Sequence, residues 1–464
     1  MNRNAFLISM FLFASFVFTS CMQVVEYITK PIVSFEDGGI VVNESDYFAG
    51  GKKTSDWLFI MYMDAEEGKI SSSIRTDFDE VEKGLAHIMN SDRSPKYGYS
   101  SIRVVALWDS IQPSDTRIFD LGPDTTLGGV GALTYNISNF NNFKVSESDS
   151  EIVDMSIFNS KEVDMSSNIT LSTFLKWVNK HYTATNVLLH IADHGTGPGK
   201  NARAMCYDFS NSKQYMYSDT FSNALSDAGY GFGKKKLSVL LLDVCFGASM
   251  EDAYQFRNCS EYMIASPNST PGPGFNYELI MQCFKSGNSA RTISKTIGES
   301  YAKYYKDMAG LSVVPTTTVI DLSKIDACAN AIDSLAQNIK DKKSSYSNYL
   351  MPNQFNMYYK GTINYLFDIG YFSYRIRNTE SELSSALQDA LSEAIVYSWR
   401  RSTTNSLPTK NYYEENNLVG CGITICGYAV GDGRISDWYK TDLDFGKRNN
   451  GWADMITDWF GVYY

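Results

Sequence analysis

Five short, continuous apolar runs place the strongest limit on how this chain folds. They are rich in Val, Ile and Leu, and polar or glycine-containing loops bound them. The runs span residues 56–64, 101–109, 186–193, 236–245 and 261–266. Strands buried on both faces of a parallel sheet have this pattern, whereas strands with one solvated face alternate between apolar and polar residues. We therefore expect a parallel sheet that is covered on both sides.

The segments between these runs have the pattern of amphipathic helices, at 74–90, 170–182 and 219–229. In the first of them, one helical stripe carries Ile74, Phe78, Val81, Leu85 and Ile88. Strands and helices that alternate along a chain favour an α/β fold with short crossover connections.

Residues 110–168 interrupt this alternation and are interpreted as an insertion. Segments 117–123 and 131–137 look like the two arms of a hairpin, and the Asn- and Ser-rich stretch 137–160 predicts a surface excursion.

The last third of the chain adds both helices and strands. Helices are expected at 290–308, 323–343 and 381–400, and strands at 311–322 and 420–430. We therefore divide the chain into a core of residues 56–290, including the insertion, and a mixed α+β region of residues 291–464 that packs on it.

The composition excludes some classes of partner. Hydrophobic residues make up 44% of the 464 residues and charged residues 20%, which is typical of a globular chain. The formal net charge is −11. Because binding to phosphates needs a basic surface, nucleic acid is not expected as a partner.

The N-terminal segment predicts export. Arg3 precedes an apolar run from residue 5 to residue 18, which is typical of a secretory signal peptide over residues 1–20. Small residues directly before Cys21 resemble the lipobox of bacterial lipoproteins. That resemblance implies cleavage before Cys21, a lipid on its thiol, and a tether over residues 21–55. The protein is then expected in the bacterial cell envelope, attached to the outer membrane, while a plain signal peptide or an uncleaved anchor is the alternative.

His190 and His194 are four residues apart, a spacing at which two histidines on a helix can bind one zinc ion. Here the preceding residues are β-prone and Gly-Thr-Gly-Pro-Gly follows, so a helix is not expected. On a strand, positions four apart are separated by roughly 13 Å, which is too far to share an ion. We therefore favour a core role for His190 and a functional role for His194, and take a zinc hydrolase as the weaker alternative. His194 follows the strand, where ligands of open α/β sheets bind.

Cys245 is a candidate nucleophile at the carboxyl end of the next apolar run. The residues after it look like the start of a helix, and a thiol at a helix N-terminus that faces an imidazole has a lowered pKa. Alternatively, Cys245 is a buried structural cysteine.

Several segments resemble the clostripain family of cysteine peptidases. The similarity is densest in LSTFLKWVNKHYTATNVLLHIADHGTGPG, LLLDVCFGASMEDAY and SPNSTPGPGFNY, and thinner in WLFIMYMDAEEG, MCYDFSN and DWYKTDLDFGKRNNGWADMITDW. The resemblance implies a caspase-like fold, with a mostly parallel sheet between helices. It also implies that His194 is the general base and acid and Cys245 the nucleophile. The backbone N–H groups of Gly195 and Cys245 are then the natural oxyanion donors.

The same resemblance implies cleavage after Arg or Lys, because Asp243 matches the acid at the floor of the family's pocket. A strand-end aspartate that caps the following turn is the alternative. This chain departs from the family at Phe275 and Asn276, and at residues 266–270, where the family often has an acidic pair. A lipoprotein that binds peptides without cleaving them therefore stays open.

The resemblance also implies two further properties of the chain. Self-cleavage between His194 and Cys245 has its candidate sites at Lys200, Arg203, Lys213 and residues 234–236. Calcium is an option at Asp64, Glu66 and Glu67, but solvated surface acids are favoured and neither a cofactor nor a metal is expected. The sequence thus predicts a lipid-anchored cysteine endopeptidase that acts on proteins or peptides.

Overall fold

The computed structural model describes thirteen segments of the chain, namely residues 40–42, 44–67, 70–110, 116–124, 151–153, 157–158, 162–198, 205–210, 214–350, 366–401, 420–427, 435–448 and 451–463. The predicted signal peptide, Cys21, most of the tether and the segment 131–137 lie outside these residues. Within them, no helix is both long and apolar enough to cross a membrane.

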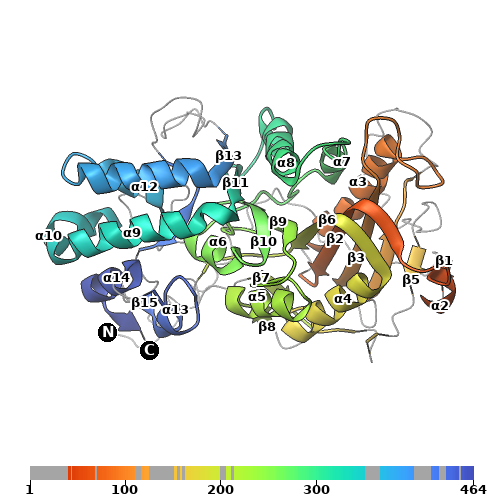
Figure 1. Cartoon of the computed structure of the whole chain (residues 1–464), viewed down its shortest axis with the longest axis horizontal. Helices are drawn as coiled ribbons and strands as arrows, with labels where there is room; N and C mark the ends of the chain where they lie inside the picture. The colour runs from red at the N-terminus through yellow and green to blue at the C-terminus, as the bar shows by residue number, and fades with distance from the viewer. Residues whose placement is uncertain are drawn as a thin grey trace, which may run out of the picture.

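In the described part of the chain, ten strands form one sheet (Figure 1). Its order is β1 (Ile40–Val42), β5 (Glu151–Val153), β4 (Arg117–Leu121), β3 (Ile102–Ser110), β2 (Lys53–Ala65), β6 (Tyr182–Ala192), β9 (Leu237–Asp243), β10 (Ser260–Ala265), β11 (Thr316–Asp321) and β13 (Ile395–Arg400). The central strands β3, β2, β6, β9 and β10 pair in parallel with their neighbours. Both flanks begin with antiparallel pairs, β4 on β3 and β11 on β10.

The five apolar runs of the sequence are these five central strands, which confirms the expected sheet. Every residue of β9 is buried, because helices cover both faces of the sheet. The strand ends at Asp243, two residues earlier than expected, so Cys245 lies in the turn that follows.

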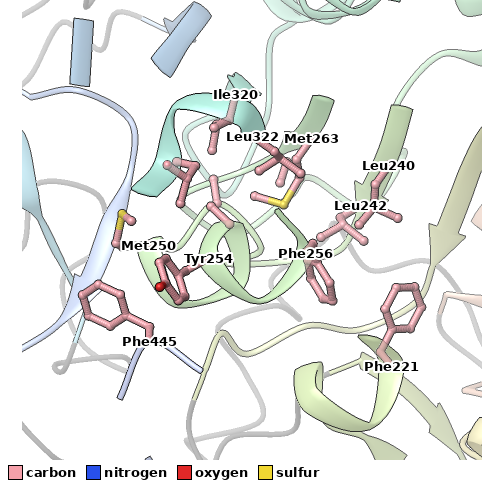
Figure 2. Packing of buried hydrophobic residues seen from close by; sticks show 14 of the residues in the cluster. Phe221, Leu240, Leu242, Met250, Tyr254, Phe256, Met263, Ile320, Leu322 and Phe445 are labelled. Carbon is pink, nitrogen blue, oxygen red and sulfur yellow. The ribbon is translucent and has the colours of Figure 1, made fainter. Parts of the chain in front are cut away.

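One face of the sheet carries α3 (Ser71–Ile88), α7 (Tyr277–Met281) and α8 (Ala290–Tyr305) (Figure 1). The predicted stripe of α3 is buried in the core of this face. The other face carries α4 (Asn168–His181), α5 (Ser218–Asp227) and α6 (Met250–Phe256). Figure 2 shows Phe256 of α6 beside Leu242 of β9, while Met250, at the start of the helix, lies near Phe445.

Local sequence signals account for where these helices begin. The hydroxyl of Ser249 accepts a hydrogen bond from the backbone N–H of Asp252 and so caps α6. Asn276 caps α7 in the same way through the N–H of Leu279. Such caps satisfy backbone donors that the first turn of a helix leaves without partners.

The region beyond residue 290 adds to the sheet as well as packing on it, because β11 and β13 extend the sheet beyond β10. The remaining helices are α2 (Glu44–Tyr47), α9 (Ile325–Ile339), α10 (Lys343–Tyr346), α11 (Ile369–Ile376), α12 (Ser381–Ala394), α13 (Asp437–Thr441) and α14 (Trp452–Phe460), with 3-10 turns η3 (Leu322–Lys324), η4 (Lys340–Lys342) and η5 (Ser347–Leu350). Short paired strands are β7 (Met205–Asp208) with β8 (Gln214–Met216), β12 (Leu366–Asp368) with β14 (Thr424–Cys426), and β15 (Ile435–Ser436) with β16 (Val462–Tyr463).

Two expected elements differ from the structure. The helix predicted over 381–400 ends at Ala394, and its last six residues form β13. These residues, Ile-Val-Tyr-Ser-Trp-Arg, include β-branched and aromatic side chains, and pairing with β11 decides their conformation. The arm predicted at 117–123 contains β4, which pairs with β3 and β5, so the strand belongs to the main sheet.

Candidate active site

Two adjacent parallel strands bring His194 and Cys245 to the same edge of the sheet. Ala192 of β6 is the direct partner of Asp243 of β9. His194 and Cys245 each follow this pair by two residues. The register therefore places both residues just beyond the same edge of the sheet.

Gly195 packs directly against the turn that contains Cys245, which we call the nucleophile turn. A Cβ atom at Gly195 would lie 2.3 Å from the carbonyl oxygen of Cys245 and 2.8 Å from Cβ of Val244. Glycine is thus required for the two segments to approach this closely.

Cys245 lies in a turn, and its side chain is enclosed. The residue is 6% exposed, and Thr270 donates its backbone N–H to Sγ at 3.3 Å. The expected position at a helix N-terminus is wrong, because α6 begins only at Met250 after its cap Ser249. Phe246, with φ 60°, turns the chain between Cys245 and the helix.

Glu67 faces the imidazole of His194. Its Oε2 lies 3.7 Å from Nε2, and both side chains are partly exposed. A carboxylate at this position favours the imidazolium that forms when the histidine accepts a proton. Glu67, one of the three acids considered from the sequence as a calcium site, thus faces the histidine.

His190 is a core residue, as expected. It is fully buried, and its Nε2 lies 2.6 Å from the hydroxyl of Tyr277. Burial lowers the pKa of His190 to about 3, so the ring is neutral. Within the described ranges, the side chains close enough to share a metal ion are Glu66, Asp109 and Glu162, with neither histidine among them. The arrangement therefore does not favour a zinc hydrolase.

Hydrogen bonds to one of its two carboxylate oxygens hold Asp243 in place. Its Oδ2 accepts hydrogen bonds from the N–H of Phe275 at 2.9 Å and from the hydroxyl of Tyr277 at 2.8 Å. Burial raises its pKa to about 6, against the lowering effect of these two bonds. Gly274, at φ 62°, allows the close approach, since a Cβ there would lie 2.3 Å from Oδ2. Phe275 and Asn276, which depart from the family pattern, therefore do not disrupt the loop beside Asp243.

Two acids of α3 that no sequence motif indicated lie on the side of the sheet that faces Asp243 and Tyr277. Asp77 is 4% exposed, and burial, followed by the charges of Asp243 and Glu80, raises its pKa well above its ordinary value. Glu80 accepts a hydrogen bond from the N–H of Tyr277 at 2.8 Å. The sequence did contain one signal for these residues. An acid lies directly beside the apolar stripe of the helix, a position where a charged side chain is unfavourable and therefore suggests a function.

Comparison with known proteins places this geometry in context. The model of the clostripain family, Peptidase_C11, matches residues 61–459. A search of curated proteins finds no match.

Two solved structures are similar in fold. A secreted C11 cysteine protease from Bacteroides thetaiotaomicron, in complex with an irreversible peptide inhibitor, aligns with a TM-score of 0.59 at 15% identity. The alignment covers 84% of this chain and 98% of that one. An inactive zymogen C11 protease from Parabacteroides distasonis aligns with a TM-score of 0.59 at 18% identity, over 85% of this chain and 98% of that one. These alignments confirm the expected caspase-like fold.

Proposed function

The chain belongs to the clostripain family and is a cysteine peptidase, and on that premise we propose that it cleaves peptide bonds after Arg or Lys. Cys245 is the nucleophile, His194 the general acid and base, and Asp243 the acid that receives the basic side chain. The observation that carries the proposal is the β6–β9 register, which puts these three residues at one edge of the sheet.

In this mechanism His194 takes the thiol proton, and Cys245 Sγ attacks the carbonyl carbon of the scissile bond. The N–H of Gly195 stabilises the negative oxygen of the tetrahedral intermediate, together with that of Cys245. The C–N bond then breaks as His194 gives the proton to the leaving amine. Water, deprotonated by His194, hydrolyses the thioester and releases Cys245. Glu67 stabilises the imidazolium in both halves of the reaction.

The proposed specificity for Arg and Lys is supported by the hydrogen bonding and the burial of Asp243. Phe275 and Tyr277 engage Oδ2, while no hydrogen bond in the described part of the chain reaches Oδ1. The residue is 8% exposed, so a substrate cation that reaches it would be largely removed from water. A charge-assisted bond is strong in such a setting.

The test is cleavage of matched fluorogenic peptides that differ only in the residue before the scissile bond, with Arg, Lys, Asp, Asn or Leu. We expect turnover with Arg or Lys. Asp243→Asn is expected to lower kcat/KM for basic peptides by roughly 10²- to 10³-fold, because the substrate cation then lacks its partner. The Leu peptide serves as the internal control and should change little. Equal losses for Leu and Arg peptides would show that Asp243 only supports the loop.

The same measurement across pH gives a second readout. Since the pKa of Asp243 is about 6, the acid is charged above that value and neutral below it. The ratio of kcat/KM for Arg to that for Leu should fall about tenfold per unit as the pH drops below 6. Titration of His194 and Cys245 affects both peptides and cancels in the ratio. A ratio that does not change with pH, or one that changes equally in Asp243→Asn, contradicts the assignment.

We also propose that the chain is exported and anchored in the cell envelope through a lipid on Cys21. The support is the signal-like segment and lipobox pattern of residues 1–21. In bacteria fed an alkyne-tagged fatty acid, the wild-type protein should carry the tag and sediment with membranes. Cys21→Ser should lose both properties, and a variant that keeps the tag would rule out lipidation at this cysteine.

Self-cleavage between His194 and Cys245 is the last part of the proposal. Among the candidate sites in the described residues, Lys234 and Lys235 are exposed, in the loop between α5 and β9. Exposed loop residues are accessible to a protease, whereas the buried residues of the strand that follows are not.

A further inference from the structure

Two exposed aromatic side chains lie at the edge of the sheet opposite the active site. Tyr97 is 104% exposed and Phe232 is 86% exposed. Their loops lead from a helix into β3 and β9, respectively. Because β3, β2, β6 and β9 pair in parallel, both loops lie at the edge where these strands begin, which we call the amino edge. A single exposed apolar residue is ordinary, but two aromatic residues at one edge indicate a contact surface.

Phe232 is held at the tip of a hydrogen-bonded turn. Lys234 donates its backbone N–H to the carbonyl oxygen of Gly231 at 2.9 Å. The preceding Tyr230 is 1% exposed, and its hydroxyl donates to the side-chain oxygen of Asn179, on α4, at 2.7 Å. The turn is therefore fixed to the body of the protein and presents the ring of Phe232 to the surroundings.

Lysines accompany both aromatic residues. The residues that form this surface, which we call the basic aromatic patch, are Lys52, Lys96, Tyr97, Phe232, Lys234, Lys235, Lys236 and Lys285. In the part of the chain that the structure describes, none of these six lysines forms an ion pair. Five of them donate to backbone carbonyl oxygens, and the ammonium of Lys285 lies 3.5 Å from the centroid of the Tyr99 ring.

The charge of the patch differs from that of the whole chain. Loops 50–56, 91–99, 227–236 and 283–288 each contain more Lys and Arg than Asp and Glu, although the formal net charge of the chain is −11. Beyond β9 this excess ends, because Arg257 pairs with Asp326. A local basic surface on an acidic protein is attracted to a polyanionic partner and directs how the protein approaches it.

The N-terminal part of the chain enters the fold at the same edge. β1 pairs in parallel with β5, β5 is antiparallel to β4, and β4 is antiparallel to β3, so β1 begins at the amino edge as β3 does. The 18 residues between Cys21 and Ile40 span at most roughly 60 Å. A lipid on Cys21 would therefore attach the protein at the edge that carries the patch.

The edge that holds His194 and Cys245 has the opposite character. It carries Asp64 and Glu66, which are both 0% exposed rather than solvated as expected from the sequence, and the partly exposed Glu67. An anionic surface attracts lysines and repels acids. Charge and tether thus favour the same orientation.

We propose that the basic aromatic patch docks the protein on an anionic lipid surface, with Phe232 and Tyr97 in the interface and the lysines at the headgroups. Aromatic rings favour the membrane interface, and lysines close to anionic headgroups add attraction. A tethered patch has a high effective concentration at the surface, so weak docking is sufficient. The active site then faces away from the bilayer. This orientation rests on the proposed peptidase and lipid anchor, whereas lipid binding by the patch does not.

The experiment uses the chain from residue 21 onward with Cys21→Ser and Cys245→Ala. This protein contains every described residue and cannot be acylated at residue 21. It also stays intact, although Lys234 and Lys235 are candidates for self-cleavage. Because the readouts need neither cleavage nor a lipid anchor, failure of the proposed function leaves the test unaffected.

Binding is measured by sedimentation with vesicles. Vesicles of phosphatidylcholine and phosphatidylglycerol are compared with vesicles of phosphatidylcholine alone. We expect at least about tenfold tighter binding to the anionic vesicles, and loss of this binding at high salt. Equal binding to both kinds of vesicle would overturn the proposal. Absence of binding would also overturn it and would make a protein the better candidate for the partner of the patch.

Variants locate the binding surface. Phe232→Ala should weaken binding to anionic vesicles about tenfold, because the apolar contact is lost. Lys234→Gln and Lys235→Gln should each weaken it about fivefold and reduce its salt dependence. Ile169→Ala is the matched control, since Ile169 is 71% exposed but lies in the first turn of α4, about 20 Å from the end that leads into β6. Equal binding by Phe232→Ala and Ile169→Ala contradicts the patch.

The orientation has its own readout. Phe232→Cys and Ile169→Cys are each labelled with a dye whose emission reports the polarity around it; the other cysteines of the described residues are buried. Anionic vesicles should shift the emission to shorter wavelength at position 232 and leave it unchanged at position 169. An equal shift at both positions would contradict docking through the amino edge. Thermal unfolding should give the same Tm for all variants, because the replaced side chains are exposed.

Discussion

Cys245→Ala is expected to abolish cleavage of every peptide in the panel, with a loss in kcat/KM of at least about 10⁴-fold. Without the thiol of Cys245 the proposed covalent intermediate cannot form, so binding and oxyanion stabilisation alone would remain. The variant should also stay a single chain, whereas the wild type should separate into two fragments on a denaturing gel if self-cleavage occurs.

Cys283→Ala provides the matched control for this result. Cys283 is also buried, at 3% exposure, but lies just after α7 on the face of the sheet that carries α3. Its replacement should cost stability, which thermal unfolding reports, and leave kcat/KM unchanged. Residual activity above a few per cent in Cys245→Ala, or an equal loss in Cys283→Ala, contradicts the role of Cys245.

Gly195→Ala is expected to lower kcat/KM by about 10²- to 10³-fold and to destabilise the protein by roughly 1–3 kcal/mol. The added Cβ would lie 2.3 Å from the carbonyl oxygen of Cys245. The loop that contains His194 and Gly195 must therefore move away from the turn that contains Cys245. That movement displaces both the N–H that serves the oxyanion and the neighbouring His194.

Gly50→Ala is the control for this substitution, because nothing lies within 4 Å of the added atom. It should change neither Tm nor kcat/KM appreciably. If Gly195→Ala loses stability but keeps full activity, the close packing is structural and the oxyanion is held by other donors.

Much of the fold followed from periodicity in the sequence. Continuous apolar runs imply strands that are buried on both faces of the sheet, and the apolar stripe of α3 implies a helix that packs on one of these faces. Both inferences hold because burial of apolar side chains drives folding, whichever side chains they pack against. Residues 395–400 were the exception. They follow a helix without a break, and only the free edge of β11 decided that they form a strand.

The candidate catalytic residues were also accessible from sequence, but their surroundings were not. His194 and Cys245 follow apolar runs, and strand ends of a parallel sheet meet at one edge. Glu67 beside His194, the Tyr277 hydroxyl on Asp243, and Thr270 over Cys245 come from segments with no sequence pattern that links them.

The sequence by itself determined the strands, the helix faces, the family and the candidate dyad, because these depend on local residue order and on motifs of short span. Tertiary structure alone decided that Asp64 and Asp109 are neighbours, and that Glu162 reaches them from the insertion. Their charges became significant only through burial, since the same acids in solvent would be screened and independent. Sequence reports which residues carry charge, and the fold decides how closely these charges lie and how far they are removed from water.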